Sequence, residues 1–314
     1  MSAPSCQLEY PACALCGSTR TRTLYVARDR LLGRPGMFPV VRCAVCGLVY
    51  LCPRPADCAL HAFYPDAYYP LEATPPAQAR AVAAGLFRRV QAWVQGQGRG
   101  TVRLLDVGCG TGVFLDLAQQ AGWHVRGIEP SAAACAYARE RFGLEVHCGT
   151  LEDAPLPPEA FDVVTMWHVL EHLPHPLADL RRVHQALASE GLLLIGVPNF
   201  ASLEARLFGR RWYSLDAPRH LYHFTPATLR AIVSTAGLRP VRLVHSSGTA
   251  GLVYSVMGDL TGLSLRLRGR PLAERTYTRL VALLDRVVQP LCSLAAAAGC
   301  GGALELYAVK DTPR

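Results

Sequence analysis

Four cysteines near the N-terminus form two pairs with the spacing of metal ligands. Cys13 and Cys16 make one pair and Cys43 and Cys46 the other, and a glycine follows each pair. A tight turn closed by the glycine aims both thiolates of a pair at one point, and four such sulfurs suit tetrahedral zinc. Two matched pairs are hard to reconcile with unrelated core or redox cysteines. The sequence therefore predicts a structural zinc that also helps this short segment to fold.

A glycine-rich turn follows the apolar run 102–107. Gly108, Gly110 and Gly112 remove side chains, so the backbone can approach a ligand, and the next helix offers unpaired N–H groups to a carboxylate or phosphate. By itself such a loop indicates only a strand-to-helix turn. However, Asp106 precedes it, and Glu129 ends the next apolar run, where an acid can accept hydrogen bonds from both hydroxyls of a ribose. Loop and acid together predict a site for a ligand with a negative group and a ribose.

Histidines and carboxylates follow two later apolar runs. Because the carboxyl ends of parallel strands meet at one edge of a sheet, these residues are expected near the ligand-binding crevice. The alternatives that remain are a packing role for Trp167 and solvated loop positions for His172 and His175. The candidates for proton transfer are His168, Glu171, His220, Tyr222 and His223.

From residue 102 onward, short apolar runs alternate with helical patterns, which predicts a mostly parallel sheet covered by helices. Strands are expected at 102–107, 124–129, 144–148, 161–166 and 191–197, and helices near 112–121, 131–142 and 176–188. A further helix should start after Thr225 and end at Gly237, and should be followed by strands at 238–246 and 303–310. The fold class expected is α/β, Rossmann-like, with a small zinc-ribbon-like module in front.

Composition narrows the setting of the protein. Of its 314 residues 51% are hydrophobic and 18% charged, as in folded globular proteins, and the net charge of +8 comes almost wholly from arginine. That charge raises the case for nucleic acid only modestly, so nucleic acid is not an expected partner. The N-terminus has no signal-peptide pattern, so a cytoplasmic location is expected, and twelve cysteines then argue against a disulfide framework. Cys6, Cys52 and Cys58 are treated as bystanders.

The apolar segment nearest in length to a membrane span, 280–299, contains polar residues that hydrocarbon would penalise, so no transmembrane helix is expected. These residues are Asp285, Arg286, Gln289 and Pro290. We expect five units along the chain: a zinc-binding module at 1–55, a helical linker at 56–100, a ligand-binding core at 101–250, a helical insertion at 251–302, and a last strand and tail at 303–314.

The glycine loop reads LLDVGCGTG, which closely resembles the first motif of class I S-adenosylmethionine (SAM)-dependent methyltransferases, and GIEPS resembles their second. This resemblance covers about residues 95–245. It implies that the methionine end of SAM lies over the loop, the ribose at Glu129 and the adenine near 149–153. Many relatives have an acid where this chain has Thr150. The implied SAM-binding residues are Asp106, Gly108, Cys109, Gly110, Gly112, Glu129, Pro130, Leu151, Glu152 and Trp167, with Asp153 as an alternative to Glu152.

The segment LEHLPHP resembles the branch that contains ubiquinone-type O-methyltransferases and sugar methyltransferases. A four-cysteine module before the core is also similar to nucleotide-sugar C-methyltransferases, in which a later histidine and tyrosine serve proton removal. This chain lacks their Tyr-His-Glu-His run, having Leu221-Tyr222-His223, and lacks their larger C-terminal domain. The prediction is methyl transfer to O or C of a small or carrier-bound metabolite, which could be sugar, polyketide-like or quinone-like.

Two other functions stay open at this point. Some RNA methyltransferases carry a zinc module, although this chain lacks the Asn/Asp-Pro-Pro-Tyr/Phe motif that grips an amino group on a base. A non-catalytic interaction protein is the second alternative, although it would not need Glu129 and the glycines. We also expect 251–299 to form amphipathic helices that shape the acceptor pocket or dock on an apolar partner, which leaves a peripheral membrane contact open.

Overall fold

The computed structural model describes residues 8–64, 76–96, 101–258 and 271–311. For residues 76–78 and 271–278 it describes the backbone alone. Three predictions therefore lie outside the described residues. They concern Cys6, the end of the helical linker at 97–100, and the amphipathic residues expected between 259 and 270.

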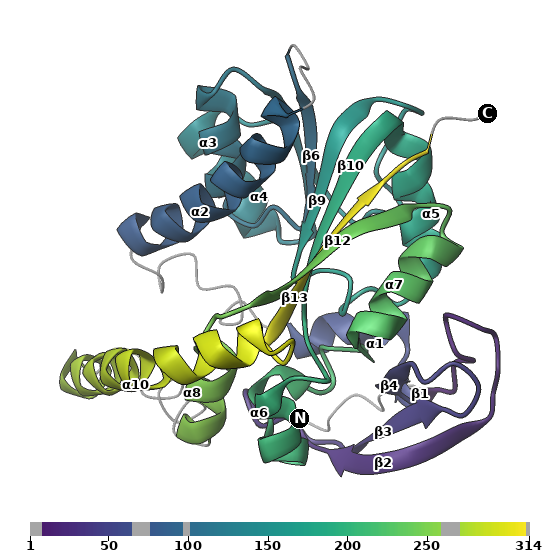
Figure 1. Cartoon of the computed structure of the whole chain (residues 1–314), viewed down its shortest axis with the longest axis vertical. Coiled ribbons are helices and arrows are strands. Elements are labelled where there is room, and N and C mark those ends of the chain that lie inside the picture. Colours follow the sequence, from purple (N-terminus) through teal and green to yellow (C-terminus); the bar gives the residue numbers. More distant parts are fainter. Residues whose placement is uncertain (1–7, 65–75, 97–100, 259–270, 312–314) are drawn as a thin grey trace.

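A seven-stranded sheet forms the centre of the molecule (Figure 1). Its strand order is β12-β13-β10-β9-β6-β7-β8. The five strands from β10 to β8 in that order run parallel, and β13 is antiparallel to both β10 and β12. The strands are β6 (Arg103–Val107), β7 (His124–Glu129), β8 (Val146–Cys148), β9 (Phe161–Trp167), β10 (Leu187–Pro198), β12 (Arg239–Ser246) and β13 (Ala303–Val309).

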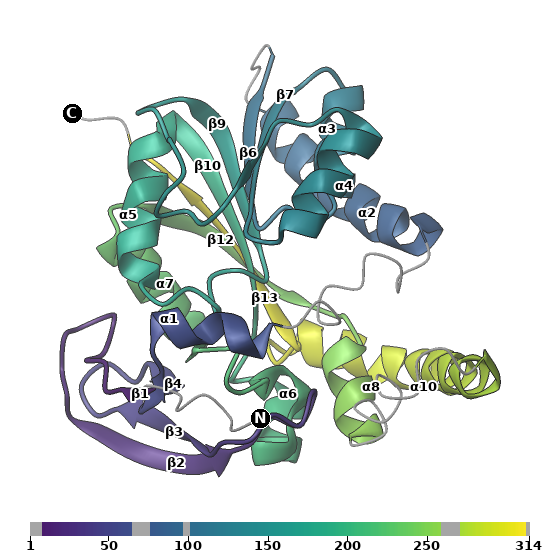
Figure 2. The same cartoon turned by 180° about the vertical axis from the view of Figure 1, so that it is seen from behind.

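Helices cover both faces of this sheet, as Figures 1 and 2 show. On one face α2 (Pro76–Gln95), α3 (Val113–Gln120) and α4 (Ala132–Phe142) contribute to one hydrophobic core. On the other face α5 (Pro176–Ala186) and α7 (Pro226–Thr235) contribute to a second core. Helix α7 begins where the sequence predicts, because Thr225 and Thr228 form a reciprocal capping box and Pro226 takes the first turn.

A smaller, four-stranded sheet lies in the N-terminal module. Three of its strands come from this module, and the fourth comes from a segment more than 150 residues later in the sequence. Strands β2 (Thr21–Ala27), β3 (Phe38–Cys43) and β4 (Val49–Leu51) are antiparallel, and β11 (Tyr222–His223) extends them beside β4. A separate pair joins β1 (Leu8–Glu9) to β5 (Arg54–Pro55). The apolar residues of this module belong to the same core as α5 and α7. Short helices α1 (Asp57–Leu60) and α6 (Leu203–Phe208) lie near this smaller sheet in Figures 1 and 2.

Two helices occupy the excursion between β12 and β13. They are α8 (Ala250–Met257) and α10 (Pro271–Ala297), and α10 extends away from the sheet (Figure 1). The side chain of Thr249 donates a hydrogen bond to Asp285 and so ties the start of α8 to α10. Among the described residues, Arg279–Ala297 is the one segment long and apolar enough to cross a membrane, and 6% of it is buried. The absence of a membrane span stays a prediction, supported by Asp285 and Arg286 within that segment.

The predicted α/β class and the mostly parallel sheet are confirmed. Most expected strands match within a few residues, although β10 begins at Leu187 because an irregular stretch precedes its regular pairing at Leu192. Short strands such as β4 and β11 carry too few residues for a periodic pattern, and the sequence did not indicate them. The division into five units stays a prediction.

Candidate functional site

The four predicted metal ligands lie together at one end of the N-terminal sheet. The sulfurs of Cys13, Cys16, Cys43 and Cys46 are all within 4.8 Å of one another, with 3.4 Å between Cys13 and Cys46 and 3.5 Å between Cys16 and Cys43. A tetrahedron with Zn–S bonds of about 2.3 Å has edges of about 3.8 Å. The donor set therefore fits a thiolate-bound zinc ion.

Each cysteine pair turns as its glycine predicts. The amide of Gly17 donates to the carbonyl of Cys13, and that of Gly47 donates to the carbonyl of Cys43, both glycines having positive φ. Burial alone would raise the pKa of Cys43, but backbone N–H groups of the turn lower it to about 6. A thiolate held by amide donors is the form that binds a metal. Cys52 and Cys58 lie outside this group.

The glycine loop lies between β6 and α3, where each glycine has a different neighbour. A Cβ on Gly108 would lie 2.4 Å from the side chain of Val169, and one on Gly112 would lie 2.5 Å from Leu144. A Cβ on Gly110 would meet nothing within 4 Å. Gly108 and Gly112 are therefore required by packing, whereas Gly110 faces open space in which a ligand can approach the backbone. The contact with Val169 also places the segment after β9 directly against the loop.

Two buried carboxylates flank the loop. Asp106 accepts a hydrogen bond from Thr165 Oγ1 at 2.6 Å, and Glu129 accepts from the amides of Gly110 and Ser131, each at 2.9 Å. Burial is the main cause that raises the pKa of Asp106 to about 7, and the nearby charge of Glu129 adds to this rise. The hydrogen bond from Thr165 partly opposes it. Burial also raises the pKa of Glu129, against the effect of its two amide donors. A cationic ligand would stabilise both carboxylates.

The remaining residues predicted to bind the cofactor lie at or just after the carboxyl ends of β6, β7, β8 and β9. Leu151 is buried and Glu152 exposed, while Thr150 donates to Asp153 through its amide at 2.6 Å and its hydroxyl at 2.8 Å. The ring of Trp167 lies against Gly196, and its buried indole N–H has no partner among the described residues. Cys109 is buried, and Pro130 directly follows Glu129.

A cluster of histidines and a glutamate lies beyond the end of β9. Oε1 of Glu171 is 3.1 Å from Nδ1 of His168, whose side chain is exposed. Glu171 itself is 1% exposed, and its Oε2 has no partner among the described residues. The rings of His172 and His220 meet edge to face at 4.6 Å between centroids. The structure thus brings His172 into the cluster rather than leaving it a solvated loop residue.

Electrostatics hold this cluster in a defined state. Burial would raise the pKa of Glu171, but the hydrogen bond and charge of His168 and the neighbouring histidines lower it to about 2. Burial and the approach of His220 lower the pKa of His172 to about 4. The same two causes lower the pKa of His223 to about 3. Near neutral pH the cluster therefore has an ionised Glu171 carboxylate beside the neutral imidazoles of His172 and His223.

His223 and Tyr222 point to different environments because they alternate along β11. The ring of His223 packs on Phe200 at 5.6 Å, and its buried Nε2 has no partner among the described residues. The hydroxyl of Tyr222 donates to the carbonyl of Pro174 and accepts from the buried guanidinium of Arg54. The structure therefore does not bring the Tyr222 hydroxyl to the Glu171 cluster. It brings it to the N-terminal module instead.

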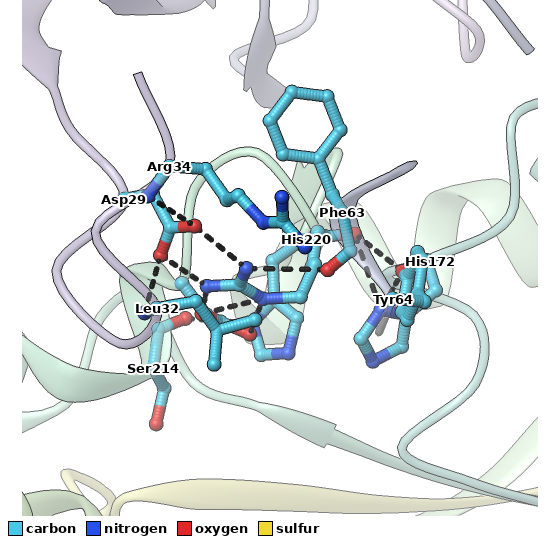
Figure 3. Close-up of polar contacts among 10 residues, drawn as sticks. Asp29, Leu32, Arg34, Phe63, Tyr64, His172, Ser214 and His220 are labelled. Carbon is cyan, nitrogen blue, oxygen red and sulfur yellow. Dashed lines mark hydrogen bonds and ion pairs between the residues drawn. The ribbon is translucent and has the colours of Figure 1, made fainter. Parts of the chain in front are cut away.

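A buried ion network connects that module to the cluster (Figure 3). Arg219 is completely buried, and its guanidinium donates to Asp29 at 2.7 and 3.0 Å and to Asp216 through Nε at 3.0 Å. The carbonyl of Arg219 accepts from His172 Nδ1 at 3.1 Å. Sequence reasoning missed this network. The only available signal was a lone Asp29 in a module otherwise rich in arginine.

These features define the class of protein. A seven-stranded sheet with one reversed strand, a glycine loop after β6 and an acid at the end of β7 is the class I SAM-dependent methyltransferase arrangement. Residues 74–243, more than half of the chain, match a family model described as a methyltransferase domain, and the chain belongs to that family. It is a SAM-dependent methyltransferase, as the resemblance implied.

The chain is also similar in sequence to curated methyltransferases. A ubiquinone biosynthesis O-methyltransferase of Bradyrhizobium diazoefficiens is 30% identical over 176 residues, covering 52% of this chain and 67% of the relative. A protein of the same name from a Ruegeria species is 32% identical over 151 residues, covering 45% and 61%. The chain thus spans about two thirds of the length of these relatives. The crystal structure of the [4+2]-cyclase SpnF is similar in fold, with a TM-score of 0.50, 21% identity, and 77% and 85% of the two chains covered.

Proposed function

We propose that this enzyme transfers a methyl group from SAM to an oxygen or carbon atom of a small or carrier-bound metabolite. In this proposal the methionine end of SAM lies over Gly110 and its ribose bonds Glu129. The acceptor lies between the end of β9 and the segment 216–223. The observation that carries the proposal is the buried Glu171 cluster, which Val169 places next to the glycine loop.

The chemistry asked of the protein is modest. The acceptor oxygen attacks the methyl carbon, the S–CH3 bond breaks, and its electron pair stays on sulfur, which becomes a neutral thioether. Most of the rate can come from holding the two reactants in line. The hydroxyl proton must leave, and the exposed His168, bonded to Glu171, offers a route from the cluster to solvent. Glu171, His220 and His223 are the other residues that we propose to line the acceptor-binding site.

Among these possible acceptors, the names of the curated relatives favour a hydroxyl group on a quinone-type molecule. Each is described as a ubiquinone biosynthesis O-methyltransferase, and they share about half of this chain. A sugar or polyketide-like acceptor is compatible with the same cluster, because each can present a hydroxyl or an acidic C–H. Oxygen methylation is the reaction we place first.

We also propose that the four cysteines hold a structural zinc and that the enzyme works in the cytoplasm with a peripheral membrane contact through α10. The zinc proposal is supported by the sulfur cluster. The membrane proposal is supported by large apolar side chains on the outer side of α10. Leu283 is 59%, Val287 66% and Leu294 70% exposed.

Two measurements test the catalytic proposal. Calorimetry should show that Glu129→Ala weakens SAM binding by about 1–3 kcal/mol, the scale for losing a charged hydrogen-bond partner. Glu145→Ala removes a glutamate that bonds Arg126 on the surface and should leave affinity unchanged. Labelled SAM supplied with catechols, sugars and carrier-linked acids should then label one acceptor class. Equal SAM affinity in both variants would refute the placement of the ribose.

A further inference from the structure

Three potential metal ligands meet beyond the end of β9, well apart in sequence from the four cysteines. One ligand atom each from Glu171, His172 and His220 lies within 4.8 Å of the others. Glu171 and His172 come from the segment that follows β9, and His220 comes from the segment that leads into β11. Two imidazoles and one carboxylate form the ligand set that many divalent transition metals take in proteins.

The histidines are oriented as metal ligands usually are. Nδ1 of His220 lies 2.8 Å from the carbonyl of Ser214, and Nδ1 of His172 lies 3.1 Å from the carbonyl of Arg219 (Figure 3). A carbonyl oxygen only accepts, so both Nδ1 atoms carry the proton and both Nε2 atoms keep a lone pair. Metal-binding histidines are typically fixed through the other ring nitrogen in this way.

The carboxylate supplies an independent observation. Glu171 is 1% exposed, its Oε1 bonds His168, and its Oε2 has no hydrogen-bond partner among the described residues. A buried carboxylate oxygen left without a partner costs free energy. A cation held by Glu171 together with the two imidazoles would give this oxygen the partner that it lacks.

We propose that Glu171, His172 and His220 bind one divalent transition-metal ion, distinct from the zinc of the four cysteines. Three protein ligands leave coordination positions open, as at catalytic rather than structural sites. The inference rests on the proposed function in one respect: an acceptor hydroxyl could occupy an open position, where the ion would lower its pKa and favour loss of its proton before methyl transfer. The metal site itself does not depend on that step.

The Arg219 network explains how such a site is held in shape. Asp29 and Asp216 fix the guanidinium of Arg219, whose carbonyl then fixes the ring of His172, and the hydroxyl of Tyr64 lies 2.9 Å from the same Nδ1. Asp29 belongs to the loop after β2. The N-terminal module therefore helps to hold His172, a ligand of the proposed metal site in the main domain, in its orientation.

Cobalt titration of the full chain tests the proposal. Protein purified without chelator should contain one zinc on the cysteines and should then bind one Co²⁺ per chain. Cobalt on thiolates gives an intense sulfur-to-metal charge-transfer band, whereas cobalt on histidine and carboxylate gives only weak d–d bands. The expected result is one equivalent of Co²⁺ with weak d–d bands and unchanged zinc content.

Two variants locate the ion, and a third is the control. Glu171→Gln and His220→Asn should each weaken Co²⁺ binding by about tenfold or more, while SAM affinity stays at the wild-type value and shows that the core is folded. His175→Gln alters an exposed histidine of the same segment, which bonds Asp57, and should bind Co²⁺ normally. Stoichiometry of zero in the wild type, or equal affinity in all three variants, would overturn the metal site. Labelling of an acceptor by metal-free enzyme would leave the proposed function standing without it.

Discussion

Asp106 shows how one buried carboxyl can make cofactor binding depend on pH. Its pKa is raised to about 7 by burial, so in the empty enzyme it is partly protonated at neutral pH. It lies beside Glu129 at the end of β6, where the cationic methionine end of SAM is proposed to bind. A cation binds the ionised carboxylate better, so binding releases a proton wherever Asp106 is protonated beforehand.

SAM affinity should therefore rise as pH increases from 6 to 8 and level off above the pKa of Asp106. Calorimetry in two buffers of different ionisation enthalpy measures both the affinity and the proton released. Asp106→Asn should bind SAM more weakly and lose the pH dependence. A wild-type affinity that does not change across this range would show that Asp106 is not linked to SAM binding.

At the level of elements, the cysteine turns determine whether β2, β3 and β4 stay together. The three strands are short, and metal binding is a main source of folding energy for such small modules. Because β11 pairs with β4, loss of the zinc also removes support from the segment that carries His220.

Elemental analysis should find one zinc per chain in the wild type and none in Cys43→Ser. The variant should lose methyl transfer, because the acceptor side loses its support. It should keep SAM binding, because β6 and β7 belong to the seven-stranded sheet and not to the sheet that carries the cysteines. Cys58→Ser changes an exposed cysteine outside the cluster and should retain the metal. Wild-type protein purified without zinc would contradict this expectation.

The outer side of α10 is the second element with a testable role. Its exposed leucines and valines recur at spacings of three and four residues, and Arg279 and Arg286 are exposed beside them. Apolar side chains with neighbouring arginines favour adsorption to an anionic lipid surface.

Replacement of Leu283, Val287 and Leu294 together by Asn should reduce co-sedimentation with vesicles of phosphatidylglycerol by about tenfold or more, since three large apolar contacts are lost. SAM affinity should not change. Val82→Asn, at a position 60% exposed on α2, should sediment like the wild type. Equal sedimentation of the triple variant would assign the stripe to another partner or to solvent.

Across the whole molecule, the Arg219 network joins two parts of the chain into one unit. Asp29 and Arg219 are 190 residues apart in sequence and are both fully buried as side chains. Removing one partner of a buried ion pair leaves an uncompensated charge, which commonly costs about 3–5 kcal/mol.

Asp29→Ala should therefore lower the free energy of unfolding by about 3–5 kcal/mol in urea titrations followed by circular dichroism. The loss is increased because the Asp29 carboxylate also accepts from the amides of Leu32 and Arg34. Asp57→Ala removes a carboxylate from an exposed ion pair with His175 and should cost far less. Similar stabilities of the two variants would show that the network does not hold the two parts together.

The sequence by itself determined the local features of this protein. Paired cysteines, a glycine loop and apolar runs alternating with helical patterns are all local, and backbone sterics and hydrophobic periodicity fix what they form. The α/β class, the SAM-dependent methyltransferase assignment and the clustering of the four sulfurs followed from them.

Tertiary structure decided which distant side chains meet. Periodicity does not say that β11 pairs with β4, so the sequence could not show that Tyr222 points to Arg54 while His223 points the other way. It also left open a solvated loop position for His172, whereas the fold packs its ring against His220. Burial of a charge depends on partners that only the complete fold supplies, and Arg219 between Asp29 and Asp216 is such a case.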